Sequence, residues 1–231
     1  MKKPLLLLVM VIGINTAVFS LTESWLSIGF EYGNFWESSS DGRDYVKGYI
    51  GSPGISLSAY SFWNGKNVGI FVHDIFAFPS KMTAEINGVK TKVDLSVYDF
   101  MMQLGMVIGP GFRVHISDNF KLHFGVGFSF LLNYATYTRS TYLYNNVSFS
   151  LFAVNIGIGG DIGAKYDFTD IFYLNIGSVV TFDFVNYTST GSSFSSVSAW
   201  AKNYFMFGLR PYICIGFNFY RDSDNLGKPK S

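Results

Sequence analysis

The sequence predicts an all-β fold, an eight-stranded antiparallel up-and-down β-barrel, and three observations support this prediction. Apolar residues alternate with small or polar residues over long stretches of the chain. Short and long polar connections also alternate between these stretches. Only 14% of the residues are charged, compared with about 25% in a typical soluble domain. A period of two indicates β-strands, and the alternating connections place each connection type at its own end of the sheet.

The composition excludes several classes of protein. The chain of 231 residues is 48% hydrophobic and 19% aromatic, which is too apolar for a disordered protein. Its net charge of +1 provides no basic surface for a nucleic acid partner. A disulfide scaffold is excluded because Cys214 is the single cysteine.

The two ends of the chain differ from its middle. Residues 1–20 resemble a cleavable signal peptide, with Lys2 and Lys3 before a short apolar run and small residues near Ser20. The run is too short for a membrane-spanning helix, which needs about 20 apolar residues. We therefore expect the barrel to occupy residues 21–220 and residues 221–231 to form a short polar periplasmic tail.

The first three strands are predicted near residues 26–33, 49–62 and 68–78. The alternation in the third strand slips near Asp74 and Ile75, which predicts a β-bulge. Five cleaner strands follow at residues 100–116, 120–134, 154–168, 172–184 and 205–219. Short turns are expected at residues 64–67, 117–119 and 169–170, and long polar loops at residues 37–48, 79–94, 135–146 and 186–198.

Alternation alone does not say which face of the barrel points inward. The interior of an eight-stranded barrel is just wide enough to be filled by side chains. The face rich in Phe, Ile, Leu and Val is too bulky for that space, whereas the face rich in Gly, Ser and Asn fits it. The bulky face of the five cleaner strands also carries no charge, as expected where a charge facing lipid would cost about 2–4 kcal/mol. The sequence therefore predicts a transmembrane β-barrel rather than a soluble barrel of the opposite sense.

Isolated charges of both signs lie on the small-residue face, and we expect them to form a charge network in the lumen. These residues are Glu31, Asp99, Arg113, Lys121, Asp161, Lys165, Asp183 and Arg210. Glu31 and Arg210 are predicted to pair across the seam between the first and last strands, because these strands become neighbours when the barrel closes. The network is either a gate that opens a small pore or a static set of paired buried charges.

No arrangement of residues indicates an active site. His115 and Ser117 form the one close His/Ser pair, and they fall at a short periplasmic turn. His73, His115 and His123 lack the spacing of metal ligands, and the glycines of residues 157–163 lack the G-x-G-x-x-G spacing. We therefore expect no enzymatic activity, no metal and no cofactor.

The last strand ends with alternating aromatic residues, Ile215-Gly216-Phe217-Asn218-Phe219-Tyr220. With the leader, the eight amphipathic strands and the two kinds of connection, this ending resembles the small outer-membrane β-barrels, the class of OmpX, OmpW and the OmpA transmembrane domain. The resemblance implies residence in a bacterial outer membrane, surrounded by lipid, after insertion by the barrel assembly machinery. We also expect a monomer.

Fold and function are separable, so two functions stay open. The first is a non-enzymatic surface protein whose long extracellular loops bind an extracellular or host ligand in adhesion, or support membrane integrity. The alternative is a small porin-like channel for ions or small solutes, apolar solutes included.

Overall fold

The computed structural model describes residues 23–40, 44–63, 66–139, 147–192 and 196–220. The predicted signal peptide (1–20) and the predicted tail (221–231) lie outside the described residues. Over the part of the chain that is described, no helix is long and apolar enough to cross a membrane.

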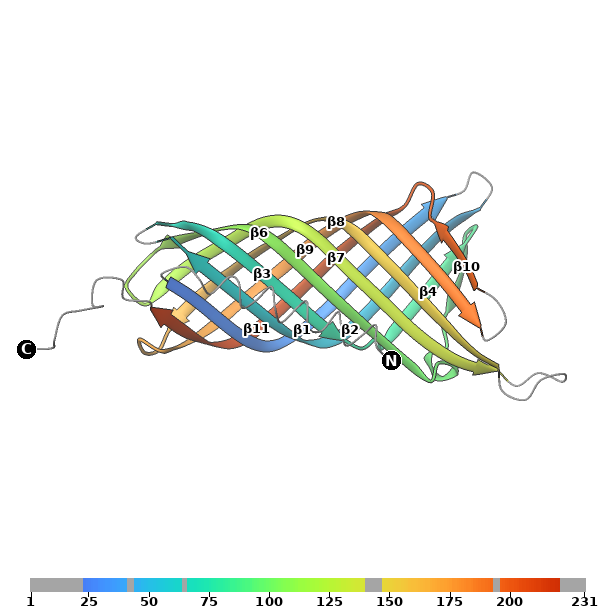
Figure 1. The fold of residues 1–231 in the computed structure, drawn as a ribbon, viewed down its shortest axis with the longest axis horizontal. Helices are drawn as coiled ribbons and strands as arrows, with labels where there is room; N and C mark the ends of the chain where they lie inside the picture. The colour runs from blue at the N-terminus through green and yellow to red at the C-terminus, as the bar shows by residue number, and fades with distance from the viewer. Residues whose placement is uncertain (1–22, 41–43, 64–65, 140–146, 193–195, 221–231) are drawn as a thin grey trace, which may run out of the picture.

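Eight strands form a closed antiparallel ring, and the predicted fold class is confirmed. Figure 1 shows the strands tilted relative to the long axis of the molecule. Each strand pairs with its neighbours along the chain, and β1 closes the ring by pairing with both β2 and β11. The strands are β1 (Glu23–Ser40), β2 (Tyr45–Phe62), β3 (Val68–Ala77), β6 (Phe100–His115), β7 (Phe120–Arg139), β8 (Val147–Asp167), β9 (Phe172–Ser192) and β11 (Phe205–Tyr220). We call the end with the short turns periplasmic and the other end extracellular, following the usual layout of such barrels.

The extracellular connections contain more strand than the sequence predicted. A hairpin of β4 (Lys81–Ile86) and β5 (Val89–Lys92) extends the sheet beside β2, and β10 (Ser196–Trp200) pairs with β9. The predicted loop at 37–48 is mostly strand, since β1 continues to Ser40 and β2 begins at Tyr45. The prediction of a long loop was wrong there because residues 37–40 of β1 are polar on both faces, so the alternation that marks a strand disappears.

The predicted bulge near Asp74 is absent from the described part of β3. Its residues pair with β2 and β6 in continuous registers, in which Asp74 lies opposite Leu57 and Met106. The alternation slips because the outward position holds Asp74 and the next, inward position holds Ile75, which lies near Gly105 in the lumen. The register shift lies instead between β8 and β9, at Ile156 and Gly157.

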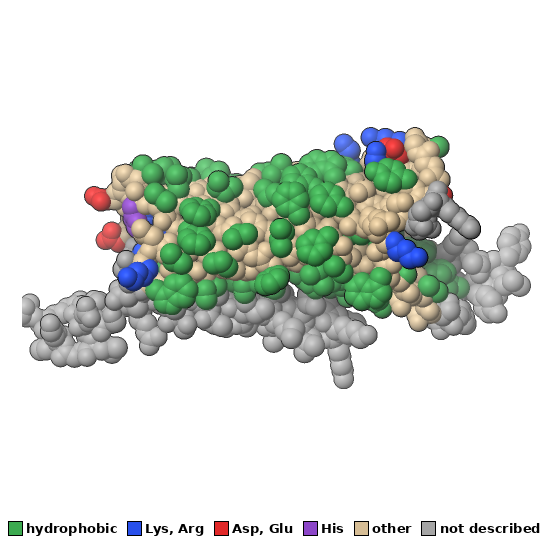
Figure 2. Space-filling model, turned by 90° about the horizontal axis from the view of Figure 1, so that it is seen from above, with side chains coloured by type: hydrophobic (Ala, Val, Ile, Leu, Met, Phe, Trp, Pro, Cys, Tyr) green, Lys and Arg blue, Asp and Glu red, His purple; other side chains and the backbone are tan. Residues whose placement is uncertain are grey.

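The bulky face of the strands points outward, as predicted. Phe30 is 75% exposed, Phe128 is 74% exposed, and many other large apolar side chains are exposed along the same face. Figure 2 shows one side of the barrel, where green apolar side chains are spread along the length between tan backbone and other side chains, with Lys and Arg side chains near the two ends. A mainly apolar band of this kind on a closed sheet, in which Asp74 is a charged exception on β3, is a surface made for lipid.

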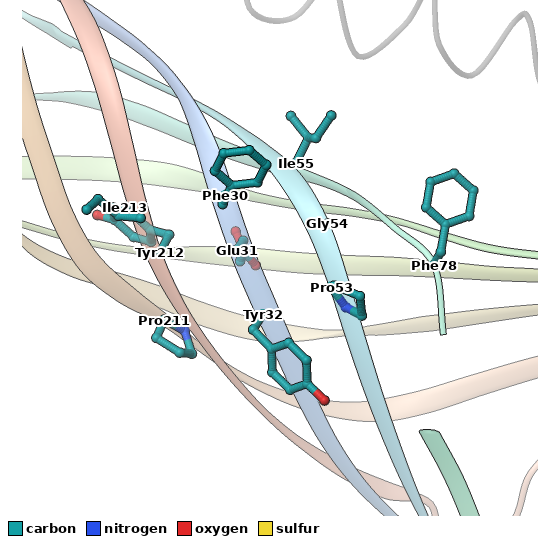
Figure 3. A pocket seen from close by; sticks show the side chains of 10 residues that line it. All are labelled: Phe30, Glu31, Tyr32, Pro53, Gly54, Ile55, Phe78, Pro211, Tyr212 and Ile213. Atoms are coloured by element: carbon teal, nitrogen blue, oxygen red, sulfur yellow. The ribbon is translucent and has the colours of Figure 1, made fainter. Parts of the chain in front are cut away.

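The seam between β1 and β11 is interrupted on its outer side. The ladder passes from the Glu31–Tyr212 pair to the Asn34–Leu209 pair, because Pro211 has no N–H group to donate. A shallow apolar groove marks this place, and Figure 3 shows Tyr32 of β1 between Pro211 of β11 and Pro53 of β2. The seam at this depth is closed from the inside by the charged residues described next.

Candidate functional site

The candidate site is the lumen, where the structure places most of the predicted charges. Glu31, Arg113, Lys121, Asp161, Lys165, Asp183 and Arg210 are all buried. Asp99 is the exception, because it precedes β6 at the extracellular end, is exposed, and accepts a hydrogen bond from Thr138 Oγ1 at 2.7 Å. The alternation of inward and outward side chains does not predict the position of Asp99, because this residue lies before the first residue of β6.

Glu31 and Arg210 pair across the seam, as the sequence predicted. Arg210 Nε lies 3.3 Å from Glu31 Oε1, and the two residues are only 2% and 3% exposed. His73 Nε2, from β3, lies 2.7 Å from Glu31 Oε2. The Glu31 carboxylate therefore links β1, β3 and β11 in the middle of the lumen.

Asp161 of β8 is the centre of a second group nearer the periplasm. Tyr60 donates a hydrogen bond to Asp161 Oδ2 at 2.7 Å, and Tyr212 donates one to Oδ1 at 2.9 Å. His123 Nδ1 lies 3.7 Å from Asp161, and its Nε2 lies 2.7 Å from Asn175 Oδ1. Four strands on opposite sides of the barrel thus meet at one carboxylate.

The periplasmic end of the lumen holds a third group. Lys121 and Lys165 both contact the Asp167 carboxylate, which also accepts a hydrogen bond from Asn218 at 2.8 Å. The ammonium of Lys165 lies 4.6 Å from the centre of the Trp25 ring, which favours the buried cation by a cation–π interaction.

Arg113 forms a separate ion pair at the same end. Its guanidinium pairs with Glu23 and lies 4.3 Å from the Phe62 ring centre. Of the predicted charges, the structure therefore brings Glu31 together with Arg210, and Lys165 with Lys121. Asp161 and Arg113 belong to groups of their own. Asp183 is fully buried and lies opposite Met206, which is four residues nearer the extracellular end of β11 than Arg210.

Apolar side chains fill the space between these charged groups. They form a buried cluster of Trp25, Tyr60, Phe62, Phe71, Val107, Tyr173, Val179, Tyr212 and Cys214. Rings such as Tyr60 and Phe71 stack with centres 5.5 Å apart. The periplasmic half of the lumen is a packed core, as expected for an eight-stranded barrel.

The extracellular half contains a cavity of about 370 Å³, which we call the vestibule. A second apolar cluster lies beneath it, formed by Phe35, Ile50, Leu131, Tyr204 and Met206. The lining of the vestibule is mostly apolar and carries a few amide and carboxyl groups. It includes Glu37, Met82, Met101, Met102, Asn133, Ala135, Ala153, Asn155 and Asn186. A concave, mainly apolar space with a few polar groups is the usual form of a site for a small molecule.

The vestibule reaches the barrel wall between β4 and β6. The β3–β6 ladder ends at the Ala77–Gln103 pair, above which Met101 and Met102 pair with β7. Within the described ranges β4 pairs with β2 and β5, and no ladder joins it to β6. The wall therefore has an unpaired gap at the extracellular end of the apolar band.

Sequence reasoning missed several members of the lumen groups. His73 and His123 were considered only for their lack of metal-ligand spacing, and the sequence did not indicate that both contact buried carboxylates. Tyr60 and Tyr212 were not singled out, although their inward positions on the strands were a usable signal. The methionines of the vestibule were missed as well. Met82 lies between Lys81 and Thr83 in a segment predicted to be a loop, and the adjacent apolar pair Met101 and Met102 does not show which side chain faces the lumen.

Among the described residues, no group of three or more His, Cys, Asp or Glu side chains could hold a metal ion. His115 is the last residue of β6 and Ser117 lies in the periplasmic turn that follows, and both are exposed to solvent. Among the hydrogen bonds and ion pairs of the described residues, none joins His115 or Ser117 to a carboxylate of the lumen groups.

Comparison with known proteins identifies the class to which the fold corresponds. No family model matches the chain, and no curated protein matches it. The outer membrane protein OprG from Pseudomonas aeruginosa superposes with a TM-score of 0.55 and 13% identity, over 87% of this chain and 97% of OprG. The outer membrane protein AlkL gives 0.53 and 12%, over 91% and 94% of the two chains.

A major outer membrane protein from Thermus thermophilus has a TM-score of 0.52 and 11% identity, over 82% of this chain and 99% of that one. At such identities the likeness concerns the fold alone. The chain has the fold of the small outer-membrane β-barrels.

Proposed function

We propose that this protein is a non-enzymatic outer-membrane barrel that binds a small, mainly apolar molecule in its extracellular vestibule. The observation that carries the proposal is the contrast between the two halves of the lumen. The periplasmic half is filled by aromatic rings and paired charges, whereas the extracellular half encloses about 370 Å³ of mostly apolar space. A filled periplasmic half does not suit an open ion channel.

The gap between β4 and β6 supplies a route for such a molecule. Met82 of β4 and Met102 of β6 line the vestibule on either side of this gap. Methionine side chains are flexible and adapt to ligands of different shape. An apolar molecule can therefore exchange between the vestibule and the outer leaflet without crossing the packed periplasmic half.

A fluorescent label in the vestibule tests this proposal. Bimane attached at Ala153→Cys, in a Cys214→Ser background, should be quenched by 1-bromodecane in a saturable manner. Filling the cavity with Ala135→Trp should abolish the saturable part, because Ala135 and Ala153 line the same space. A matched label at Val126→Cys, on the lipid-facing side, should show quenching that rises linearly with partitioned bromodecane.

Linear quenching at both labels would contradict binding in the vestibule. A steady conductance of the purified wild-type protein in planar bilayers would contradict the closed lumen, and would favour the channel interpretation instead.

Surface interaction is the second candidate function, and one observation favours it. Val197 and Trp200 of β10 and Val89 of β5 are between 64% and 71% exposed beyond the apolar band. Exposed apolar side chains at a barrel rim suit contact with an extracellular partner. This candidate predicts that a variant with polar residues at these positions loses the interaction while bromodecane binding is unchanged.

A further inference from the structure

Four lysines share one face of the sheet formed by β2, β4 and β5. Residues directly opposite each other in an antiparallel ladder lie on the same face. Lys47 lies opposite Glu85, which lies opposite Lys90, and these three residues form one row across the strands. Lys92 lies opposite Thr83 in the next row, and Lys81 lies two residues before Thr83. We call these lysines the lysine face.

The lysine face points away from the lumen. Ile50 is buried in the apolar cluster beneath the vestibule, and Met82, its partner across β2 and β4, packs against that cluster. Side chains alternate between the two faces of a strand. Lys81, one residue before Met82, therefore points to the outside of the barrel, as does Lys47, three residues before Ile50.

The lysine face lies at the extracellular border of the apolar band. Tyr49 packs against Trp36 at 5.6 Å between ring centres, and Trp36 stacks on Phe207 at the same distance. These outward rings belong to the kind of aromatic girdle that marks a membrane interface. Lys81 Nζ lies 5.6 Å from the Tyr49 ring centre. The ammonium groups are thus placed at the depth of lipid headgroups.

The face has an excess of positive charge. Glu85 is the one acid within the three rows that hold these lysines, and its carboxylate lies 3.9 Å from Lys47 Nζ. Lys81, Lys90 and Lys92 are exposed. Asp94, the next acid along the chain, accepts hydrogen bonds from the Ser96 hydroxyl and backbone groups, which lower the pKa of its carboxyl, and the nearby Lys92 ammonium lowers it further. In the described part of the chain no ion pair joins Lys81, Lys90 or Lys92 to an acid, so these exposed ammonium groups can contact an anionic ligand.

We propose that the lysine face binds the phosphate groups of a phosphorylated glycolipid in the extracellular leaflet. Its position selects a lipid rather than a soluble anion, because the lysines lie directly above the aromatic girdle and face outward. Each lysine near an anionic membrane surface contributes about fivefold in affinity. Bound lipid would hold the β4–β5 hairpin at the membrane surface.

Native mass spectrometry of the detergent-solubilised protein tests this proposal, with bisphosphorylated lipid A as the probe. The triple variant Lys81→Gln/Lys90→Gln/Lys92→Gln should retain lipid A at least tenfold more weakly than the wild type. The matching Lys-to-Arg triple variant should retain it as the wild type does. The control variant Lys66→Gln/Lys202→Gln removes two lysines outside the lysine face and should bind normally. A heat-modifiable gel shift confirms that each variant is folded.

Three further probes distinguish the sources of negative charge. Dephosphorylated lipid A should bind at least tenfold more weakly than lipid A, and inorganic pyrophosphate and heparin should not displace lipid A at equal charge. Displacement by heparin at lower concentration would overturn the proposal in favour of an anionic polysaccharide. Equal retention of lipid A by the folded Gln triple variant would overturn it as well.

Discussion

Replacing Phe128 with arginine is expected to lower the free energy of unfolding by about 2–4 kcal/mol, the cost of a cation at the midplane of a barrel's lipid face. Phe128 is 74% exposed and lies at the centre of β7, where it pairs with Ile108 and Ile158. In water, such an exposed position would tolerate arginine with a change below about 0.5 kcal/mol. Urea unfolding in phospholipid vesicles, followed by tryptophan fluorescence, measures the difference.

Val197→Arg is the matched control for Phe128→Arg. Val197 is 68% exposed, but it belongs to β10, beyond the apolar band. Its substitution should change the free energy of unfolding by less than about 0.5 kcal/mol. Equal effects at the two positions would mean that the exposed face of β7 does not lie in hydrocarbon.

Replacing Glu31 with glutamine is expected to destabilise the barrel by about 3–5 kcal/mol, because Arg210 would be left as a buried cation without its anion. Arg210 Nε lies 3.3 Å from the Glu31 carboxylate, and His73 contacts the other carboxylate oxygen. The loss is measured by urea unfolding in vesicles. The substitution keeps the size of the side chain, so the effect reports the charge.

Two variants separate this pairing from a general effect of losing a carboxylate. Asp99→Asn removes an exposed charge and should leave the free energy of unfolding within about 0.5 kcal/mol of the wild type. The double variant Glu31→Gln/Arg210→Met removes both charges and should recover most of the loss. A double variant no more stable than Glu31→Gln alone would argue against a direct pairing.

The orientation of the strands could be predicted from the sequence because lipid and lumen impose opposite preferences on alternate residues. Phe128 and Ser129 illustrate this, since the first is exposed and the second buried. The pairing of Glu31 with Arg210 was also predictable, because closure of the ring makes the first and last strands neighbours. Both the alternation of residue types and the position of the first strand beside the last in a closed ring can be inferred from a single sequence.

Contacts across the lumen could not be predicted in the same way. Tyr60 meets Asp161 only because the strands tilt and stagger around the barrel, which sets the depth of each residue. The alternation places Tyr60 inside without indicating its depth. Likewise, the hairpin of β4 and β5 was missed because lysines and a glutamate replace apolar residues on its outward face, beyond the lipid.

The central claim is that the outward face of the strands lies in hydrocarbon, and nitroxide accessibility tests it most directly. A spin label is attached at Phe128→Cys or Val197→Cys, in a Cys214→Ser background, and the protein is placed in phospholipid vesicles. The label at 128 should collide readily with oxygen and hardly with a water-soluble nickel chelate, whereas the label at 197 should show the reverse. A label at 128 that is as accessible to the nickel chelate as the label at 197 would contradict the membrane-spanning barrel.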